Sequence, residues 1–332
     1  MSKYPKLFIP GPTHVSDEIL EEFKTPQIGH RTPEISKIIS ELVQGVQNVL
    51  YTNNHIYLVS HPATGLWEMA IRNSVKNKVL HCVNGAFSNK WAKVSDSIGV
   101  DYDILEYDWG LAVKAEDIER KLKLDHYDAV AIVHNETSTG AMSNIKEIGN
   151  MMKSFPDTYL LVDAVSSMAG IKIEVDLCEI DFILASTQKA WGLPAGFSIA
   201  AASDRFIKRS SEIDNKGYIL DVNTYEKYYV KNQTPYTPSI PHLFGLKKVL
   251  DLIGKEGIER SFGRKFADKY NIHRTRTGFP NKGLDTFSNM ARIGVYVIDR
   301  VIQEQIGGGI NLEKDIWYIP NMGHDIIAGS KL

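Results

Sequence analysis

The 332-residue chain contains 43% hydrophobic and 23% charged residues, the balance of a folded globular protein rather than a disordered or membrane-bound one. Its formal net charge of -2 provides no broad basic surface for nucleic acid, and its two cysteines lie far apart without metal-ligand spacing, as in a reducing compartment. The apolar stretch before Pro10 is too short for a signal or a membrane span. We therefore expect a cytoplasmic protein with no metal site and no nucleic-acid or membrane partner.

Apolar runs and helix-period segments alternate along the first 240 residues, and runs rich in branched side chains predict buried strands. The predicted strands are Ile56–Ser60, Val79–Val83, Ala129–Val133, Tyr159–Val162, Phe182–Ala185 and Phe197–Ala201. The helices predicted between them are Glu34–Val49, Leu66–Asn73, Asn89–Ile98, Ala115–Leu122 and Ile145–Phe155. This alternation implies crossover connections, and hence an α/β fold with a mostly parallel mixed sheet flanked by helices.

The pattern changes after residue 240. Two long helices are predicted first, then a shorter helix and a final strand, at Pro241–Lys255, Ile258–Thr277, Val295–Gln305 and Ile316–Ile319. The length of the chain also exceeds that of one ordinary domain. We therefore predict a large domain over residues 14–250 and a small α+β domain formed by residues 1–13 and 251–332.

An acid and an amine follow two of the predicted strands. Asp163 ends the run Tyr159–Val162, and Lys189 comes shortly after the run Phe182–Ala185. Ligands of open α/β sheets bind at this end of the strands. A partly buried lysine has the lowered pKa that a Schiff-base amine needs, and an ionised aspartate keeps a pyridine nitrogen protonated. Together the two residues indicate pyridoxal phosphate as the cofactor, with Lys189 and Asp163 as the catalytic pair.

Seven short stretches in order resemble the class V aminotransferases, the fold type I group of pyridoxal-phosphate enzymes that includes serine/pyruvate and alanine/glyoxylate aminotransferases. The resemblance covers most of the chain. It lies in Pro10-Gly11-Pro12-Thr13, Gly29-His30-Arg31, Ala63-Thr64-Gly65, Asn84-Gly85-Ala86-Phe87, Glu136-Thr137-Ser138-Thr139-Gly140, Val162-Asp163-Ala164-Val165-Ser166-Ser167 and Ser186-Thr187-Gln188-Lys189.

The resemblance implies a role for each matching residue. Lys189 corresponds to the lysine of the internal aldimine, Asp163 to the partner of the pyridinium nitrogen, and Phe87 to an aromatic side chain that stacks on the ring. Thr137 matches a residue that bonds the ring oxygen or the aldimine region, and Val165 is expected to contact the cofactor.

The cofactor phosphate is expected at the start of a helix. Ala63, Thr64 and Gly65 follow a predicted strand, so backbone N–H groups that are free at the helix start can bind an anion. The resemblance makes that anion the cofactor phosphate and adds Gln188 as a ligand. It also implies that Thr237 reaches the phosphate of a neighbouring subunit, and therefore a homodimer with shared active sites.

The resemblance is weakest on the substrate side. Family members carry an arginine near the C-terminus that pairs with the substrate carboxylate, and Tyr318 stands at that position here. One neutral hydroxyl in place of the guanidinium loses about 1.5 to 3 kcal/mol. Arg31 is the nearest substitute for an anion-binding group, and the C-terminal domain is expected to be shortened.

The predicted activity is transamination from a small amino acid such as alanine or serine to a small oxo acid such as pyruvate or glyoxylate. Two alternatives remain: lyase, decarboxylase or amine transaminase chemistry with the same cofactor, because the carboxylate-binding arginine is replaced, or a binding subunit without activity. A Rossmann dehydrogenase shares the strand and helix alternation, but no GxGxxG motif follows any predicted strand.

Overall fold

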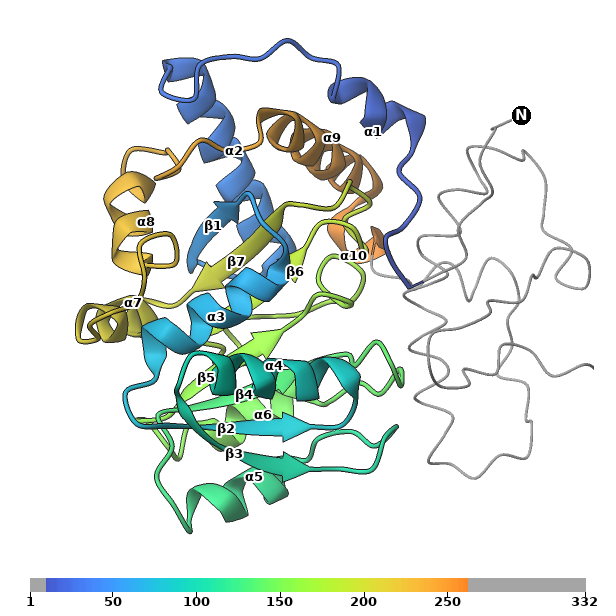
Figure 1. Cartoon of the computed structure of the whole chain (residues 1–332). Helices are drawn as coiled ribbons and strands as arrows, with labels where there is room; N and C mark the ends of the chain where they lie inside the picture. The colour runs from blue at the N-terminus through green and yellow to red at the C-terminus, as the bar shows by residue number, and fades with distance from the viewer. Residues whose placement is uncertain (1–9, 262–332) are drawn as a thin grey trace, which may run out of the picture.

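A single mixed sheet organises residues 10–261, the part of the chain that the computed structural model describes (Figure 1). Its seven strands have the order β1-β7-β6-β5-β4-β2-β3. Strand β7 runs in the direction opposite to the other six strands, so the prediction of a mostly parallel mixed sheet is confirmed. The strands are β1 (His55–Val59), β2 (Lys78–Val83), β3 (Asp101–Glu106), β4 (Ala129–Val133), β5 (Tyr159–Asp163), β6 (Phe182–Ser186) and β7 (Ser198–Ala202).

Helices cover both faces of this sheet and bury its apolar side chains. Helices α2, α5, α6 and α9 enclose one cluster of core residues, and α3, α4, α7 and α8 enclose the other. The helices of the described residues are α1 (Asp17–Glu22), α2 (Pro33–Leu50), α3 (Ala63–Ser74), α4 (Ala86–Ser97), α5 (Ala115–Leu122), α6 (Ile145–Met152), α7 (Asp204–Ser211), α8 (Val222–Tyr229), α9 (Ile240–Glu256) and α10 (Ile258–Ser261).

Within the described residues the predicted strands and long helices are found close to their expected positions, but four shorter elements were missed; the predicted helix Ile258–Thr277 lies outside these residues beyond Ser261. Strand β3 lies at the edge of the sheet and is largely exposed, so it lacks the apolar run of a buried strand. Helix α1 has one buried residue and helices α7 and α8 have two each, too few for a clear apolar repeat. Helix α4 begins three residues before its predicted start, which places Phe87 in its first turn.

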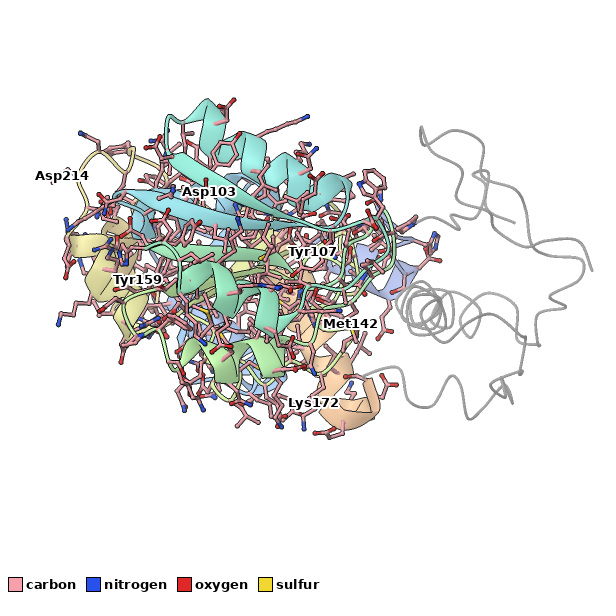
Figure 2. The ribbon with its side chains drawn as sticks, turned by 90° about the horizontal axis from the view of Figure 1, so that it is seen from below. Asp103, Tyr107, Met142, Tyr159, Lys172 and Asp214 are labelled. Carbon is pink, nitrogen blue, oxygen red and sulfur yellow. The ribbon has the colours of Figure 1, made fainter. Side chains whose placement is uncertain are left out.

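The carboxyl ends of the parallel strands lie at one edge of the sheet. In Figure 2, Tyr159 at the start of β5 lies near one end of the molecule and Met142, after the carboxyl end of β4, near the other. Asp163 ends β5, and it pairs in register with Leu184 of β6. The loop after β6 therefore delivers Lys189 to the same edge as Asp163.

The predicted small domain lies largely outside the described residues. This applies to residues 1–9, to everything after Ser261 and so to Tyr318, to the helix Val295–Gln305 and to the strand Ile316–Ile319. The boundary at residue 250 stays a prediction. Within residues 10–261, no helix combines the length and apolarity that crossing a membrane requires.

A polar cluster docks α8 onto β1. Glu226 of α8 accepts hydrogen bonds from the Tyr57 hydroxyl at 2.6 Å and from the imidazole Nδ1 of His55 at 2.9 Å. The His55 ring also stacks on Tyr229 at 4.2 Å, and Asp204 lies 3.9 Å away. The hydrogen bond to Glu226 raises the pKa of His55, although burial opposes the rise. Protonated His55 therefore stabilises this contact.

We predict that the Glu226→Gln variant loses a pH-dependent part of the wild-type stability. Because the pKa of His55 is higher in the folded state, the stabilisation is complete below the pKa of unfolded histidine and is lost as pH rises through the folded-state pKa. Urea unfolding of both proteins from about pH 5 to about pH 9 measures the difference. A difference in stability that grows with rising pH would contradict this assignment.

Candidate active site

Asp163 is a buried carboxylate held by two donors. Its side chain is 3% exposed, its Oδ1 accepts a hydrogen bond from the Val165 backbone N–H at 2.7 Å, and its Oδ2 accepts one from the Trp67 indole at 2.7 Å. Burial raises the pKa of Asp163 to about 6, and the two hydrogen bonds oppose that rise. At neutral pH the carboxylate is therefore mostly ionised, as a partner for a cationic ring nitrogen must be.

Lys189 lies in the loop after β6, and only 8% of it is exposed. Burial lowers the pKa of its ammonium group, while the charge of Asp163 acts in the opposite direction. A larger fraction of this amine is therefore neutral than of an exposed lysine, which is the form that attacks a carbonyl carbon.

The N-terminal segment packs directly on Lys189. Thr13 donates its backbone N–H to the Gln188 carbonyl at 3.0 Å and its hydroxyl to the Lys189 carbonyl at 3.2 Å. A Cβ added to Gly11 would lie 2.6 Å from Cδ and 2.9 Å from Nζ of the lysine. Only glycine leaves room here, so the motif that begins at Pro10 shapes the position of the amine. No local sequence pattern points to this contact.

The start of α3 is open to an anion. Its N-cap residue is Pro62, and no side chain caps this end of the helix. Beside it lies the His61 ring, 2.7 Å from the position that a Cβ on Gly65 would occupy. Within the described residues, His61 Nε2 and Gln188 Oε1 are buried without a hydrogen-bond partner. The uncapped helix start leaves backbone N–H donors for an anionic ligand, whereas the two orphaned atoms lack a donor, because the Gln188 oxygen only accepts and His61 already donates through Nδ1 to Pro62.

Phe87 is held at the first turn of α4 by Glu136. This carboxylate is fully buried and accepts hydrogen bonds from the backbone N–H groups of Phe87 at 3.3 Å and Ser88 at 2.9 Å, and from the Ser138 hydroxyl at 2.8 Å. Its negative charge therefore caps the helix start. The Phe87 side chain is 38% exposed, so a planar ligand can stack on it. Glu136 had no predicted role beyond its place in a motif.

Thr137 and His134 follow β4 and contact the loop after β5. The Thr137 hydroxyl bonds the hydroxyl of the buried Ser166, and His134 Nδ1 bonds the Ser167 hydroxyl at 2.9 Å. Burial lowers the pKa of His134 to about 4. The histidine is therefore neutral and joins two loops, whereas a hydroxyl at position 137 can also bond a ligand.

Arg31 binds the segment that contains Thr237. Its guanidinium donates to the carbonyls of Thr234 at 2.7 Å and Pro235 at 3.0 Å, and it lies 4.9 Å from the centre of the Tyr228 ring. Thr237 itself is exposed. These bonds engage Arg31 with the chain itself and hold the segment in place.

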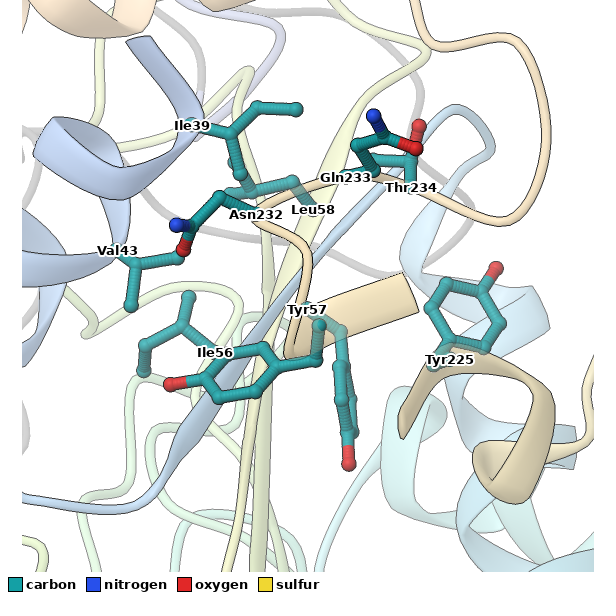
Figure 3. Close-up of a pocket in the computed structure, with 10 residues that line it drawn as sticks. Ile39, Val43, Ile56, Tyr57, Leu58, Tyr225, Asn232, Gln233 and Thr234 are labelled. Atoms are coloured by element: carbon teal, nitrogen blue, oxygen red, sulfur yellow. The ribbon is translucent and has the colours of Figure 1, made fainter. Parts of the chain in front are cut away.

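A small cavity of about 20 Å³ lies under the same segment (Figure 3). Residues of α2, β1 and α8 line it together with Asn232, Gln233 and Thr234. It has room for about one water molecule and none for a cofactor. Among the described residues, no three histidine, cysteine, aspartate or glutamate side chains gather as metal ligands would.

The structure thus brings the predicted site residues to neighbouring loops at one edge of the sheet. Asp163 ends β5, and Val165 follows it. Gln188 and Lys189 lie in the loop after β6, and Thr137 follows β4. The segment Ala63 to Gly65 begins α3, and Phe87 lies in the first turn of α4. The chemistry of this set fits pyridoxal phosphate: an amine, a carboxylate, an open helix start and a free aromatic face. Arg31 instead bonds the segment that contains Thr237, and Tyr318 lies outside the described residues.

Comparisons with known proteins agree with this fit. The family model for class V aminotransferases matches residues 12–268. An uncharacterised aminotransferase of Methanocaldococcus jannaschii is 34% identical over 98% of this chain and 84% of its own length. A serine–glyoxylate aminotransferase of Methylorubrum extorquens is 32% identical over 78% of this chain and 67% of its own length.

A solved structure has the same fold. The alanine–glyoxylate aminotransferase of Nostoc sp. aligns with a TM-score of 0.76 and 27% identity, over 81% of this chain and 74% of its own length. The family match covers well over half of the chain, and the cofactor of these enzymes is the one that the site fits. The chain therefore belongs to the class V aminotransferase family and is a pyridoxal-phosphate-dependent aminotransferase.

Proposed function

We propose that this aminotransferase moves the amino group of a small amino acid, of the alanine or serine type, to a small oxo acid such as glyoxylate or pyruvate, with Lys189 as the covalent anchor of the cofactor. The observation that carries the proposal is the buried amine of Lys189, whose pKa is lowered, at the same sheet edge as the buried carboxylate of Asp163. Pyridoxal phosphate supplies an electron sink for bonds at the carbon that bears the amino group.

Lys189 has two tasks in this proposal. Its neutral amine would hold the cofactor through the aldehyde carbon, with loss of water, and the same nitrogen, when free, would carry a proton as general base and acid. Burial favours the neutral amine that both tasks need. Gly11 and Thr13 hold the lysine from the N-terminal side, which restricts where its nitrogen lies.

The other residues orient the cofactor. Asp163 keeps the ring nitrogen protonated, Phe87 covers one ring face, and Thr137 bonds the polar edge of the ring. Ala63, Thr64 and Gly65 at the start of α3 hold the phosphate together with the side-chain amide N–H group of Gln188. Val165 donates its backbone N–H to Asp163, and its partly buried side chain packs against the core cluster that includes α3.

The substrate class rests on the relatives. Serine and glyoxylate stand in the name of the Methylorubrum extorquens relative, and alanine and glyoxylate in that of the Nostoc sp. structure. These substrates are small, and each carries a carboxylate that needs a cationic or hydroxyl partner. Arg31 and Tyr318 are the two candidates, although Arg31 already donates to two backbone carbonyls.

A homodimer with shared active sites completes the proposal. Thr237 is exposed, and so are two large side chains before it, Tyr218 at 84% and Val230 at 76%. A second subunit would cover these apolar groups and receive Thr237 at its cofactor phosphate. We place this dimer in the cytoplasm.

The first test is the reaction itself. The purified protein with pyridoxal phosphate is expected to convert alanine or serine and glyoxylate to the matching products, and borohydride reduction is expected to fix the cofactor on Lys189, as peptide mass spectrometry would detect. Lys189→Ala should lower the rate by at least about 10²- to 10⁴-fold, because its amine carries the proton. Lys172→Ala is the control, since ion pairs raise the pKa of that exposed lysine.

Release of ammonia or carbon dioxide in place of amino transfer would contradict transamination and favour the lyase or decarboxylase alternative. If wild type and Lys189→Ala were equally inactive with every amine and the cofactor attached to neither, the chain would be a binding subunit. If borohydride reduction fixed the cofactor on another lysine, Lys189 would not be its covalent anchor.

The second test changes the space beside the amine. Gly11→Ala is expected to displace Lys189, because the added methyl would lie 2.8 Å from Cε. We expect the cofactor to attach covalently more slowly, and its visible absorbance measures this attachment. Gly99→Ala is the matched control, since Gly99 also has a positive φ but open space around it. Equal attachment rates in the two variants would show that the contact with Gly11 is unimportant.

The third test concerns the dimer. We expect sedimentation analysis to give a dimer for the wild type, and Tyr218→Asp with Val230→Asp to shift it toward monomer. Thr237→Val should remain a dimer and bind the cofactor about 10- to 100-fold more weakly, the effect of losing one hydrogen bond to a charged group. A wild-type monomer that binds the cofactor as well as a dimer would contradict shared sites.

A further inference from the structure

Trp67 contacts the carboxylate that the proposed cofactor needs. It is the fifth residue of α3, only 3% of it is exposed, and its indole N–H donates to Asp163 Oδ2 at 2.7 Å. Side chains alternate between the two faces along β5. Leu160 and Val162 face the helices α2 and α6, whereas Leu161 faces α3. Asp163 continues this alternation toward α3, which brings its carboxylate to the indole.

We infer that Trp67 is a positioning residue for the cofactor ring: its indole fixes and orients the Asp163 carboxylate that meets the ring nitrogen. The inference rests on the proposed function, in which Asp163 is that partner. No sequence motif pointed to Trp67, because the contact joins residues that lie far apart in the chain.

The chemistry of the two donors explains the choice of residue. An indole N–H and the Val165 backbone N–H can only donate a hydrogen bond, whereas a hydroxyl could turn and accept a hydrogen bond from a protonated, neutral acid. Each carboxylate oxygen therefore receives one obligatory donor, and this arrangement favours the ionised acid against burial and against the nearby charge of Glu136. The remaining lone pairs of the two oxygens can accept a hydrogen bond from a protonated ring nitrogen.

Helix α3 would thereby hold both ends of the cofactor. Its first residues, Ala63 to Gly65, form the proposed phosphate site, and Trp67 comes two residues later, about 3 Å further along the helix axis. A shift of this helix would move the phosphate site and the Asp163 donor together. The phosphate site and the donor that orients Asp163 are therefore carried by one helix.

The indole is itself fixed by packing. Trp91 of α4 stacks on it with ring centres 6.1 Å apart at 18°, and the Trp91 N–H donates to the Trp67 carbonyl at 3.3 Å. Trp91 is equally buried and has no hydrogen bond to Asp163 among the described residues. Trp91→Phe is therefore a matched control: it makes the same substitution in the same cluster but leaves the donor to Asp163.

The contact can be tested without the cofactor. In the protein labelled with ¹⁵N-tryptophan, the five tryptophans give five indole signals, and Trp67→Phe identifies one of them. That signal is expected to shift as the pH falls through about 6, where Asp163 takes up a proton, and to stop titrating in Asp163→Asn. An indole signal that ignores pH, or that titrates unchanged in Asp163→Asn, would overturn the inference.

The role of the contact is tested with pyridoxamine phosphate, which has no aldehyde and so binds without a bond to Lys189. Calorimetry of the cofactor-free Trp67→Phe variant should give binding about 10- to 100-fold weaker than wild type at neutral pH, as for the loss of one hydrogen bond to a charged group. The pH at which binding is half lost should also be higher than in the wild type, because the carboxylate has lost a donor.

Trp91→Phe separates this role from packing. We expect it to keep the wild-type pH of half-binding, whatever stability it loses. The same pH of half-binding in Trp67→Phe and wild type would overturn the inference. A wild-type protein whose indole titrates but that binds no pyridoxamine phosphate would overturn the proposed function, and with it the role of Trp67, while the hydrogen bond itself would stand.

Discussion

A carboxylate buried at the end of β5 is the constraint on which the site depends. Taking Asp163 out of water disfavours its charge, and the neighbouring Glu136 adds to the penalty. The fold offsets this with two donors whose positions come from elsewhere: the turn after β5 supplies the Val165 N–H, and α3 supplies the Trp67 indole. A bound cationic ring would complete the compensation. The site is therefore most favourable when the cofactor is present, and this couples binding to the stability of the sheet edge.

The sequence predicts the fold because burial and periodicity coincide in most of the strands. In β4, β5, β6 and β7 nearly every side chain is buried, so each appears as a continuous apolar run. Strand β3 lacks such an apolar run because it carries Asp101, Asp103 and Glu106 at the edge of the sheet. Asp163 and Lys189 were predictable for a related reason. Strand ends at one edge of a parallel sheet come together whatever the intervening sequence.

The residues that sequence reasoning missed act through long-range contacts. Gly11 matters because a Cβ at this position would lie 2.6 Å from Cδ of the Lys189 side chain. Glu136 matters because it caps a helix that belongs to another part of the chain. Neither contact follows from local spacing, since the partners are separated by many residues and join only in the folded sheet. The opposite holds for Arg31: its motif suggested an anion ligand, yet its guanidinium bonds two backbone carbonyls.

Helix α3 shows why the same motif can specify both cofactor binding and stability. Leu66, Met69 and Ala70 are fully buried, so this helix cannot move without disturbing the core over β5 and β6. Its first turn is nevertheless left uncapped, a local loss that a folded protein tolerates where a ligand supplies the missing partner. The buried part of the helix, from Leu66 onward, therefore holds the uncapped first turn in place. Because the indole that contacts Asp163 belongs to this buried part, the acid is held before any cofactor arrives.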